Sequence, residues 1–514
     1  MNGRKAVDVV HLHSDDNIVV AARQLSAGQH VAFGAGTVEV RHPVRLGHKV
    51  ATQRIKQGET VLKYGQVIGR ASCDIEPGDW VHVQNLAMSE QAKQYDFATQ
   101  VPDDPPPITD RTFMGYRRAD GKAGTRNYLA VISAVNCSAS VSKYIVDRLD
   151  ESILCDYPNV DGVIALTHST GCGIPYGSRH HDQLNRVLSG FAKHPNVAGY
   201  LLIGLGCEVA TLTRLVESGD LVQLTHGKSK APPTLSIQEC GGTAKTVEQG
   251  LKIVADMLPA ANDVKRQPIA AGELMLGLEC GGSDGNSGVT ANPALGAAAD
   301  LLVAAGGTAV LSETTEIYGA EHLLTQRARS RQIGEKLIEL IDWWKWYAKT
   351  LGGELDNNPT PGNKDGGLTT IYEKSLGAVA KGGTTALNGV FDYAELVTKK
   401  GFVFMDTPGY DPPSITGMVA GGANMVCFTT GRGSCYGCKP VPSIKIASNT
   451  PMYEHMVDDM DVNAGVVLEE QTVQQVGQHI FEMILDTASG KKTKSELHGV
   501  GEEEFVPWQI GPIL

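Results

Sequence analysis

The chain has 514 residues, of which 42% are hydrophobic and 20% are charged, and its formal net charge is −12 at pH 7. This length is sufficient for about two to four domains, and the composition is ordinary for a globular protein. The negative charge argues against nucleic acid or an anionic membrane as the main partner. No apolar stretch reaches the roughly 18 residues that a membrane-spanning helix needs.

The cysteines and the N-terminus indicate the compartment. The first residues lack the apolar core of a secretory signal. Ten cysteines in a long chain of this kind are expected to be free thiols, ligands or catalytic groups rather than a disulfide framework. We therefore expect a cytoplasmic protein that acts on a small molecule, with no nucleic-acid or membrane partner. We also expect a homo-oligomer, with a dimer favoured.

The distribution of glycines, prolines and apolar runs predicts four segments. Residues 1–90 carry short apolar runs separated by glycines, which predicts a small β-rich domain with one short helix near residues 20–25. Residues 91–113 include a proline-rich polar stretch and are expected to form a linker. Residues 114–265 and 266–514 alternate strand-like and helix-like patterns. The fold class is therefore α/β, with a two-part body of mostly parallel sheets.

A cysteine recurs in the second segment. Strand-like runs end at Cys137, Cys172, Cys207 and Cys240, at intervals of 35, 35 and 33 residues. This spacing is that of one βαβ step, so parallel strands would place the four thiols along one edge of a sheet. Each thiol alone is typical of a tight turn. Together with His168, the set also suits a borderline metal such as Fe(II) or Zn(II).

Residues 279–296 form the richest polar loop of the chain. They follow an apolar strand pattern, precede a small-residue helix pattern and contain five glycines among hydroxyl, amide and carboxyl groups. In open α/β sheets, ligands bind where strand ends meet helix starts, because backbone N–H groups are available there. We predict a functional site at this loop.

Three further loops carry candidate groups. Glu313 and Glu316 follow a predicted strand and suit a metal or acid–base chemistry, although acidic residues also favour helix starts. Lys364 lies in an irregular loop, and Arg432 lies between glycines after a buried strand, where it can bind a carboxylate in a bidentate manner. One long helix is expected over residues 320–351.

Several motifs together resemble the altronate dehydratase and galactarate dehydratase family. They cover nearly the whole chain and are specific in combination. They are His13–Asn17, Gly47–Lys49, Gly115–Arg118, Gly124–Asn127, Glu279–Gly285, Ser287–Pro293, Asn358–Lys364, Thr430–Gly433, Asp461–Gly465 and Glu504–Gly511. The chain departs from the expected pattern at Cys435 to Cys438, which leaves the exact sugar acid open.

The resemblance implies a fold and an activity. The N-terminal segment would be a SAF domain of β-clip type, joined to the α/β body. The activity would be the Fe(II)-assisted dehydration of a sugar acid, with Mn(II) or another divalent metal as alternatives. The reaction expected first is D-altronate to 2-dehydro-3-deoxy-D-gluconate. Galactarate or another aldonate or aldarate, sulfolactate as the substrate of a sulfo-lyase, and a non-catalytic sugar-acid-binding protein are the alternatives.

Dehydration of an aldonate develops negative charge on an enediolate, so it needs a cation, a base and an acid. The predicted catalytic residues are His13, His48, His168 and Lys364. The predicted substrate-binding residues are Arg126, Ser283, Asp284, Thr290, Asn292, Asn363 and Arg432. The predicted metal ligands are drawn from Cys137, His168, Cys172, Cys207, Glu313 and Glu316. One mononuclear centre is expected, with an iron–sulfur cluster as the competing possibility.

Overall fold

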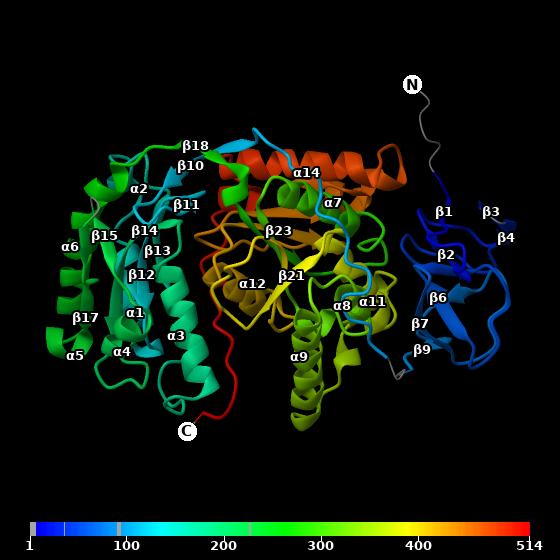
Figure 1. Cartoon of the computed structure of the whole chain (residues 1–514), viewed down its shortest axis with the longest axis horizontal. Helices are drawn as coiled ribbons and strands as arrows, with labels where there is room; N and C mark the ends of the chain where they lie inside the picture. The colour runs from blue at the N-terminus through cyan, green and yellow to red at the C-terminus, as the bar shows by residue number, and fades with distance from the viewer. Residues whose placement is uncertain (1–6, 35, 90–93, 226–227, 514) are drawn as a thin grey trace.

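The structure is a computed structural model that describes residues 7–34, 36–89, 94–225 and 228–513. Three regions follow one another across the molecule: an N-terminal β-rich region at one end, the middle region at the other end, and the C-terminal region between them (Figure 1). The predicted fold class is confirmed. No helix of the described part is long and apolar enough to cross a membrane. The exact domain boundaries stay predictions.

The N-terminal region consists of short strands in three small sheets. The sheets have the orders β1-β2-β5-β8, β3-β4 and β6-β7-β9. The strands are β1 (Val9–Val10), β2 (Ile18–Ala21), β3 (His30–Phe33), β4 (Gly36–Glu39), β5 (Lys49–Ala51), β6 (Thr60–Lys63), β7 (Gln66–Ala71), β8 (Trp80–Val81) and β9 (Leu86–Ala87). The helix expected near residues 20–25 is wrong. Val20 lies in β2, and Leu25 pairs with Val44, because β-branched residues here alternate across a packed sheet.

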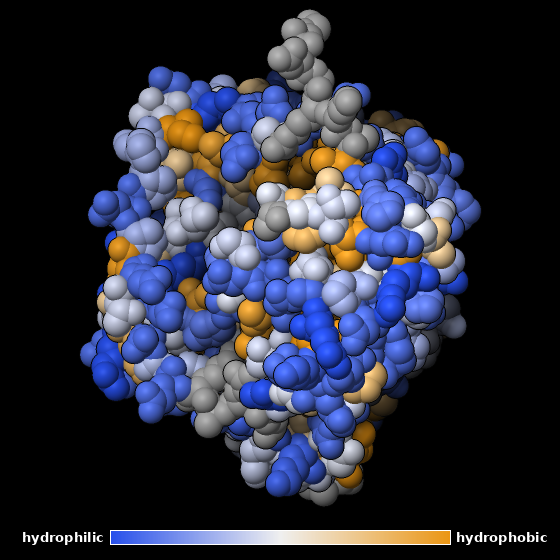
Figure 2. Space-filling view, turned by 90° about the vertical axis from the view of Figure 1, so that its right-hand side faces the viewer, coloured by the Kyte–Doolittle hydropathy of each residue, from blue (hydrophilic) through white to orange (hydrophobic). Residues whose placement is uncertain are grey.

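The N-terminal region shares a hydrophobic core with the C-terminal region. Ile18, Ile55 and Ile68 belong to the same buried cluster as Leu276 and Leu295. Most of its apolar side chains are therefore used inside the molecule. The outer face of this side is largely hydrophilic, with smaller hydrophobic patches (Figure 2). Such packing fixes the N-terminal region against the body.

The expected linker runs along the body. The backbone amides of Ala98, Gln100 and Ile108 donate hydrogen bonds to carbonyls of Thr325, Gln326 and Ala304. The chain then enters β10 (Thr112–Arg117), which pairs with β11 (Ala123–Gly124) and β18 (Gln267–Ala270) in an antiparallel sheet. This small sheet connects the middle and C-terminal regions.

The middle region is a parallel four-stranded sheet of order β13-β12-β14-β17, in which all pairs are parallel. Its strands are β12 (Tyr128–Ser133), β13 (Gly162–Leu166), β14 (Val197–Gly204) and β17 (Thr234–Ser236). The helices are α1 (Ala139–Val146), α2 (Glu151–Leu154), α3 (Arg179–Ala192), α4 (Leu212–Ser218), α5 (Ile237–Cys240) and α6 (Thr243–Asn262). A hairpin of β15 (Gln223–Thr225) and β16 (Lys228–Lys230) flanks it. The predicted parallel strands are confirmed, with Cys137, Cys172 and Cys207 in the segments after β12, β13 and β14. The strand expected to run up to Cys240 is wrong, because β17 ends at Ser236 and Cys240 is the last residue of α5.

The C-terminal region contains a parallel seven-stranded sheet of order β21-β22-β20-β19-β23-β24-β25. Its strands are β19 (Met275–Cys280), β20 (Thr308–Leu311), β21 (Leu387–Phe391), β22 (Gly401–Met405), β23 (Met425–Thr430), β24 (Ser443–Ala447) and β25 (Val462–Asn463). Its main helices are α7 (Ala291–Ala304), α8 (Glu321–Gln326), α9 (Arg331–Thr350), α10 (Pro361–Asp365), α11 (Ile371–Ala378), α12 (Asp411–Ala420), α13 (Thr450–His455), α14 (Val473–Ala488) and α15 (Lys494–Leu497).

Both faces of the large sheet are covered. Leu276 and Leu311 pack into one cluster with residues of α7 and α14, whereas Val310 and Val426 pack into another with residues of α12 and α3. Successive residues of a strand point to opposite faces, which explains this alternation. Loops at the carboxyl edge are therefore the natural place for a site.

The single helix expected over residues 320–351 is wrong, because the structure has two. α8 ends at Gln326 and α9 begins at Arg331. Between them, Ala328 forms a bridge with Leu387 at the edge of the sheet, and the Ser330 hydroxyl caps the new helix by accepting from the amide of Ile333. A hydroxyl N-cap is a local start signal that the apolar pattern concealed.

Candidate active site at the carboxyl edge of the large sheet

A cluster of acids, lysines and one thiol lies at the carboxyl ends of β19 and β20. We call it the acid–lysine cluster; it consists of Glu279, Cys280, Glu313, Glu316, Lys374, Lys381 and Asp411. The first six side chains are buried, whereas Asp411 is half-buried. Glu279 and Cys280 end β19, Glu313 and Glu316 lie at η3 (Thr314–Glu316), and the lysines come from α11 and η5 (Val379–Gly382).

Two ion pairs connect the helices to the strand ends. Lys381 Nζ lies 2.6 Å from Glu313 Oε2, and Lys374 Nζ lies 2.5 Å from Glu316 Oε1. Asn358 also donates to Glu316 Oε1, at 2.7 Å, and accepts from Lys374 through its Oδ1. The carboxylates of Glu313 and Glu316 are thus each held in place by a lysine ammonium group.

The thiol of Cys280 faces the same carboxylates. Its Sγ lies 3.3 Å from Glu313 Oε2 and 3.6 Å from Glu316 Oε2. Burial and the neighbouring charge of Glu313 raise the pKa of Cys280 well above its usual value. Burial also opposes the charged form of Glu313, but Lys381 and Lys374 more than offset this and keep its pKa below the usual value.

The other three acids of the cluster have raised pKa values. Burial and then repulsion from Glu313 raise the pKa of Glu316, although Lys374 opposes the shift. Burial, with repulsion from Glu313, raises the pKa of Glu279 well above its usual value. The same two causes raise the pKa of Asp411 to about 7. A carboxyl group with a pKa near neutral pH can both donate and accept a proton under physiological conditions.

The donor set fits a divalent transition metal. Ligand atoms of Cys280, Glu313 and Glu316 lie within 4.8 Å of one another, as do those of Glu279, Glu313 and Asp411. Oε1 of Glu313 and Oε1 of Glu279 are buried, and neither has a hydrogen-bond partner among the described residues. Buried acceptors normally have partners, so these two oxygens are available to a bound cation. Mixed thiolate and carboxylate ligands suit iron, manganese or zinc.

Three loops converge beside the cluster. Gly282 follows Cys280, and its carbonyl accepts from the backbone amide of Arg432 at 2.8 Å. Lys364, expected in an irregular loop, lies in the short helix α10, which Thr360 caps. Asn363 of this helix donates to the carbonyl of Ser283 at 2.9 Å, which fixes α10 against the loop after β19. At Gly366 a Cβ atom would lie 3.0 Å from Cβ of Asp284 and 3.2 Å from Cδ of Arg432, so the loops touch.

The N-terminal region closes this arrangement. Gly47 lies against the glycine loop, since a Cβ at Gly285 would come far too close to its carbonyl. Lys49 Nζ donates to the carbonyl of Gly367 at 2.6 Å, and both Lys49 and Lys63 pair with the fully buried Glu373. Glu373 directly precedes Lys374 of the cluster. The N-terminal region is thus tied to the helix that supplies a cluster lysine.

Three family models match the chain. Residues 7–89 match "Altronate/galactarate dehydratase SAF domain", residues 115–262 match "D-galactarate dehydratase/Altronate hydrolase, second domain", and residues 271–513 match "D-galactarate/Altronate dehydratase, C-terminal". The chain belongs to the D-galactarate/altronate dehydratase family. The predicted resemblance is confirmed, and the chain is an enzyme of the dehydratase type.

Characterised relatives match over almost their full lengths. The altronate dehydratase of Bacillus subtilis is 35% identical, with 95% of this chain and 96% of the relative covered. The galactarate dehydratase (L-threo-forming) of Escherichia coli is 38% identical, with 94% and 93% covered. The altronate dehydratase of the same organism is 34% identical, with 95% and 96% covered.

The structure divides the predicted metal ligands of this family member into two places. Glu313 and Glu316 lie in the acid–lysine cluster. Cys137, Cys172 and Cys207 are exposed at the carboxyl edge of the middle sheet. His168 is buried there, with Nε2 2.9 Å from the carbonyl of Ser133 and Nδ1 accepting from the amide of Thr170. Burial lowers the pKa of His168 to about 4, so its ring is neutral.

Of the predicted catalytic residues of the N-terminal region, only His48 has a hydrogen bond to the C-terminal region among the described residues. His48 is buried; its Nε2 lies 3.2 Å from the carbonyl of Asp365, and its Nδ1 accepts from Trp80. His13 is about half-exposed and lies beside Gly65, and its Nδ1 accepts from the amide of Asp15. Lys364 is half-buried, and no ion pair of its ammonium is found among the described residues. Their catalytic roles stay predictions.

Most predicted substrate-binding side chains make internal hydrogen bonds. Asp284, Thr290, Asn292 and Asn363 bond to neighbouring loops and strands, and Arg126 is buried in an ion pair with Glu496 far from the cluster. Ser283 Oγ is buried and has no hydrogen-bond partner in the part of the chain that the structure describes, whereas Arg432 is exposed at the end of β23. Among these residues, Ser283 and Arg432 offer the groups most available to a substrate.

Sequence reasoning missed the two cluster lysines, Asp411, Asn358 and the placement of Cys280. A signal for the lysines existed. Lys374 and Lys381 are seven residues apart, two helical turns, in a stretch otherwise made of small and apolar residues. A lysine in such a stretch is buried and must have a partner.

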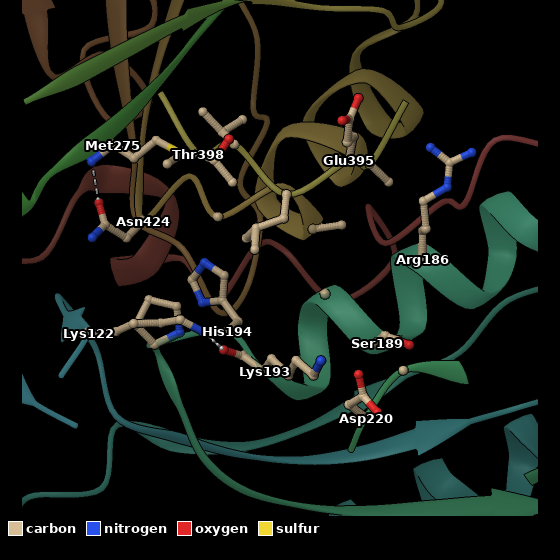
Figure 3. A pocket seen from close by; sticks show the side chains of 18 of the residues that line it. Lys122, Arg186, Ser189, Lys193, His194, Asp220, Met275, Glu395, Thr398 and Asn424 are labelled. Atoms are coloured by element: carbon tan, nitrogen blue, oxygen red, sulfur yellow. Dashed lines mark hydrogen bonds between the residues drawn. The ribbon is translucent and has the colours of Figure 1, made fainter. Parts of the chain in front are cut away.

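A cavity of about 640 Å³ lies elsewhere, between α3 and the C-terminal region. Arg186 and Ser189 of α3 lie on one side of it and Glu395 on the other (Figure 3). It also touches Met275 and Asn424, which begin β19 or directly precede β23. The cavity is therefore at the amino edge of the large sheet, away from the acid–lysine cluster.

Proposed function

We propose that this protein is a sugar-acid dehydratase that converts D-altronate to 2-dehydro-3-deoxy-D-gluconate and water in hexuronate catabolism. The acid–lysine cluster beside three converging loops carries this proposal. The full-length likeness to altronate dehydratases supports the choice of substrate. An aldonate needs a cationic site for its carboxylate and a proton donor for its departing hydroxyl, and the carboxyl edge offers both.

The metal is proposed to be Fe(II), with Mn(II) or another divalent ion as alternatives. Cys280, Glu313 and Glu316 would hold it. When bound, such a metal stabilises the negative charge that develops on the enediolate. Lys374 and Lys381 fix the carboxylates and favour their charged forms against burial, because each lysine forms a buried ion pair with one of them. The excess negative charge of the cluster is thereby reduced before a metal binds.

The remaining steps fall to residues with available groups. Arg432 can bind the substrate carboxylate through two parallel N–H donors. His13 has an imidazole nitrogen available to take the proton next to that carboxylate, and Lys364 is the alternative base. Asp411, whose pKa is about 7, can protonate the departing hydroxyl, which leaves as water. The enol product then tautomerises to the 2-keto acid. His48 and His168 remain further predicted catalytic groups.

Galactarate is the second candidate substrate, because a galactarate dehydratase is also a full-length relative. A sulfo-lyase and a non-catalytic sugar-acid-binding protein remain as outcomes of the test. The proposal includes a cytoplasmic homo-oligomer, with a dimer favoured, which gel filtration with light scattering would measure.

The test is formation of a 2-keto acid. The purified protein with Fe(II) under reducing conditions is offered D-altronate, galactarate and sulfolactate in turn. We expect product from D-altronate, loss of turnover on chelation and recovery with Fe(II). Glu316→Gln should abolish turnover, whereas Glu335→Gln, at a partly exposed side chain of α9, should not. Absence of a keto product from every acid, with binding unchanged after chelation, would identify a binding protein instead.

A further inference from the structure

Three exposed thiols follow three neighbouring strands at the carboxyl edge of the middle sheet. Cys137 follows β12, Cys172 follows β13, and Cys207 follows β14, and β12 lies between the other two strands. Cys240, after the fourth strand, is only partly exposed, and its Sγ donates to Gln249. No hydrogen bond of the first three sulfur atoms is found in the described part of the chain. Three neighbouring loops therefore each present one thiol without a partner.

The loops that carry the thiols are fastened to one another. The amide of Asn136 donates to the carbonyl of Thr170 at 2.9 Å, and the amide of Ala210 donates to the carbonyl of Gly171 at 3.1 Å. Ser138 Oγ donates to the carbonyl of Ile203 at 2.9 Å. Each thiol-bearing loop is thus bonded to the loop or strand of its neighbour.

Glycines and buried polar side chains set the shape of these loops. Gly171, directly before Cys172, has a φ of 99°, and a Cβ there would lie 2.4 Å from the carbonyl oxygen of Ala134. Gly206, directly before Cys207, has a φ of 122°, and its amide donates to the buried Glu208 at 2.6 Å. Only glycine accepts such a conformation without strain. The three thiols therefore project from a tightly braced backbone.

The spacing of the three thiols distinguishes a single metal ion from a larger inorganic cluster as the ligand that they could bind. In the acid–lysine cluster, the ligand atoms within each of two groups of three lie within 4.8 Å of one another, but no such group among the described residues includes these three cysteines. A single tetrahedral ion would bring its sulfur ligands to about 4 Å from each other, given metal–sulfur distances of about 2.3 Å. A larger inorganic group can bridge thiolates that lie further apart.

We propose that Cys137, Cys172 and Cys207 bind an iron–sulfur cluster of the cubane type through three thiolates. This site is separate from the acid–lysine cluster and does not depend on the proposed dehydration. One iron of the cluster would have no cysteine ligand from this set. The site also connects to the body, because Gln509 of the C-terminal tail donates to Ser169 at 2.8 Å, and Arg179, after the Cys172 loop, pairs with Asp406 at the carboxyl end of β22.

The experiment measures iron and acid-labile sulfide in the full chain, purified without oxygen and reconstituted with Fe(II) and sulfide. We expect about four sulfides per chain, together with visible absorption that bleaches on reduction. Cys137→Ser, Cys172→Ser and Cys207→Ser should each lose at least half of the sulfide. Cys155→Ser, which removes an exposed thiol of the same region outside this edge, should retain all of it. Reconstituted protein without sulfide, or full sulfide in all three variants, overturns the proposal.

Two further measurements keep the result independent of folding and of dehydratase activity. In the reconstituted wild-type protein, iodoacetamide should modify Cys155 while Cys137, Cys172 and Cys207 are protected, and equal modification of all four would contradict the proposal. Glu313→Gln, which alters the acid–lysine cluster, should keep its sulfide and absorption. Loss of sulfide in that variant would place the cluster at the other site.

Discussion

Lys381 and Glu313 form an ion pair of 2.6 Å in which each side chain is only 1% exposed. The lysine comes from η5 and the glutamate from the loop after β20, so the pair joins a helix to the edge of the sheet. Burying a charge costs free energy, and here the attraction between the two opposite charges offsets that cost. The pair is therefore both a structural contact and the electrostatic environment of the candidate metal ligands.

Lys381→Met should leave Glu313 as a buried charge without its closest cation. We expect a loss of about 3–5 kcal/mol in the free energy of unfolding, the usual cost of removing one partner of a buried pair. Lys439→Met is the matched control, because Lys439 and Glu502 also lie 2.6 Å apart but Glu502 is 60% exposed. That control should cost less than about 1 kcal/mol. Urea denaturation measures both, and equal costs would contradict the prediction.

The sequence predicted the carboxyl edge as the place of the site but not its composition. Strand-to-loop transitions at Cys280 and Glu313 are local patterns, and both lie where expected. Lys374 and Lys381 reach the site from helices, 58 and 68 residues further along the chain than the glutamates that they pair with. Such pairing depends on how α11 packs on the sheet, which no local pattern encodes. The likeness to a family identified the reaction but not this ion-pair arrangement.

In the middle region, by contrast, a sequence pattern did predict which residues share a sheet edge. The regular spacing of Cys137, Cys172 and Cys207 predicted a shared sheet edge, and the parallel pairing of β12, β13 and β14 places them on one. The regular spacing of the cysteines was sufficient to predict this shared edge, because each β-strand and following helix repeats the same geometry. His168 was weighed as a ligand, yet both of its nitrogens are engaged by Ser133 and Thr170. Hydrogen bonds of this kind depend on the folded loop.

The junction of the N-terminal region should respond to alkaline pH through Lys49. Burial lowers the pKa of Lys49 to about 8, against its usual value of 10.5, although Glu373 opposes the shift. Between pH 8 and 10.5 the unfolded chain keeps this proton and the folded chain does not, so the stability from this group rises with pH in that window. The slope should reach up to about 1.4 kcal/mol per pH unit.

Lys49→Met should remove this slope while Glu373 keeps Lys63 as its partner. Chemical denaturation at pH 8 and pH 10 measures the difference. Lys56→Met, which changes an exposed lysine of the same region, should leave the slope unchanged. A wild-type protein whose stability from this group falls over the same window would show that the sign is wrong.

Arg432→Lys tests the carboxylate site. The lysine keeps the charge but loses the two parallel donors, so KM for the sugar acid should rise about tenfold to a hundredfold, with a smaller change in kcat. Arg432 is exposed, so the free energy of unfolding should not change. Arg331→Lys, at the exposed start of α9, is the control. An unchanged KM would exclude Arg432 from carboxylate binding.

His48→Asn tests whether the N-terminal region takes part in catalysis. His48 contacts the carbonyl of Asp365, in the short helix α10 that also carries Lys364. Turnover should fall at least about a hundredfold, the low end for loss of an acid–base group, while the protein stays folded. His42→Asn, at a side chain that is 65% exposed, should have normal turnover. A rise in KM alone would instead indicate that His48 only positions the loop.

Cys280→Ser tests the thiol as a metal ligand, with Co(II) as a spectroscopic probe. In the metal-free protein, burial first and then the charge of Glu313 keep the pKa of the thiol high, so it is protonated. Binding of a metal requires the thiolate, and the proton must therefore be released. We expect near-ultraviolet sulfur-to-cobalt absorption in the wild type and its loss in Cys280→Ser. Cys427→Ser is the matched control, because Cys427 is also buried and lies opposite Leu278 on the neighbouring strand β23. If the absorption persisted in Cys280→Ser, the carboxylates alone would hold the metal.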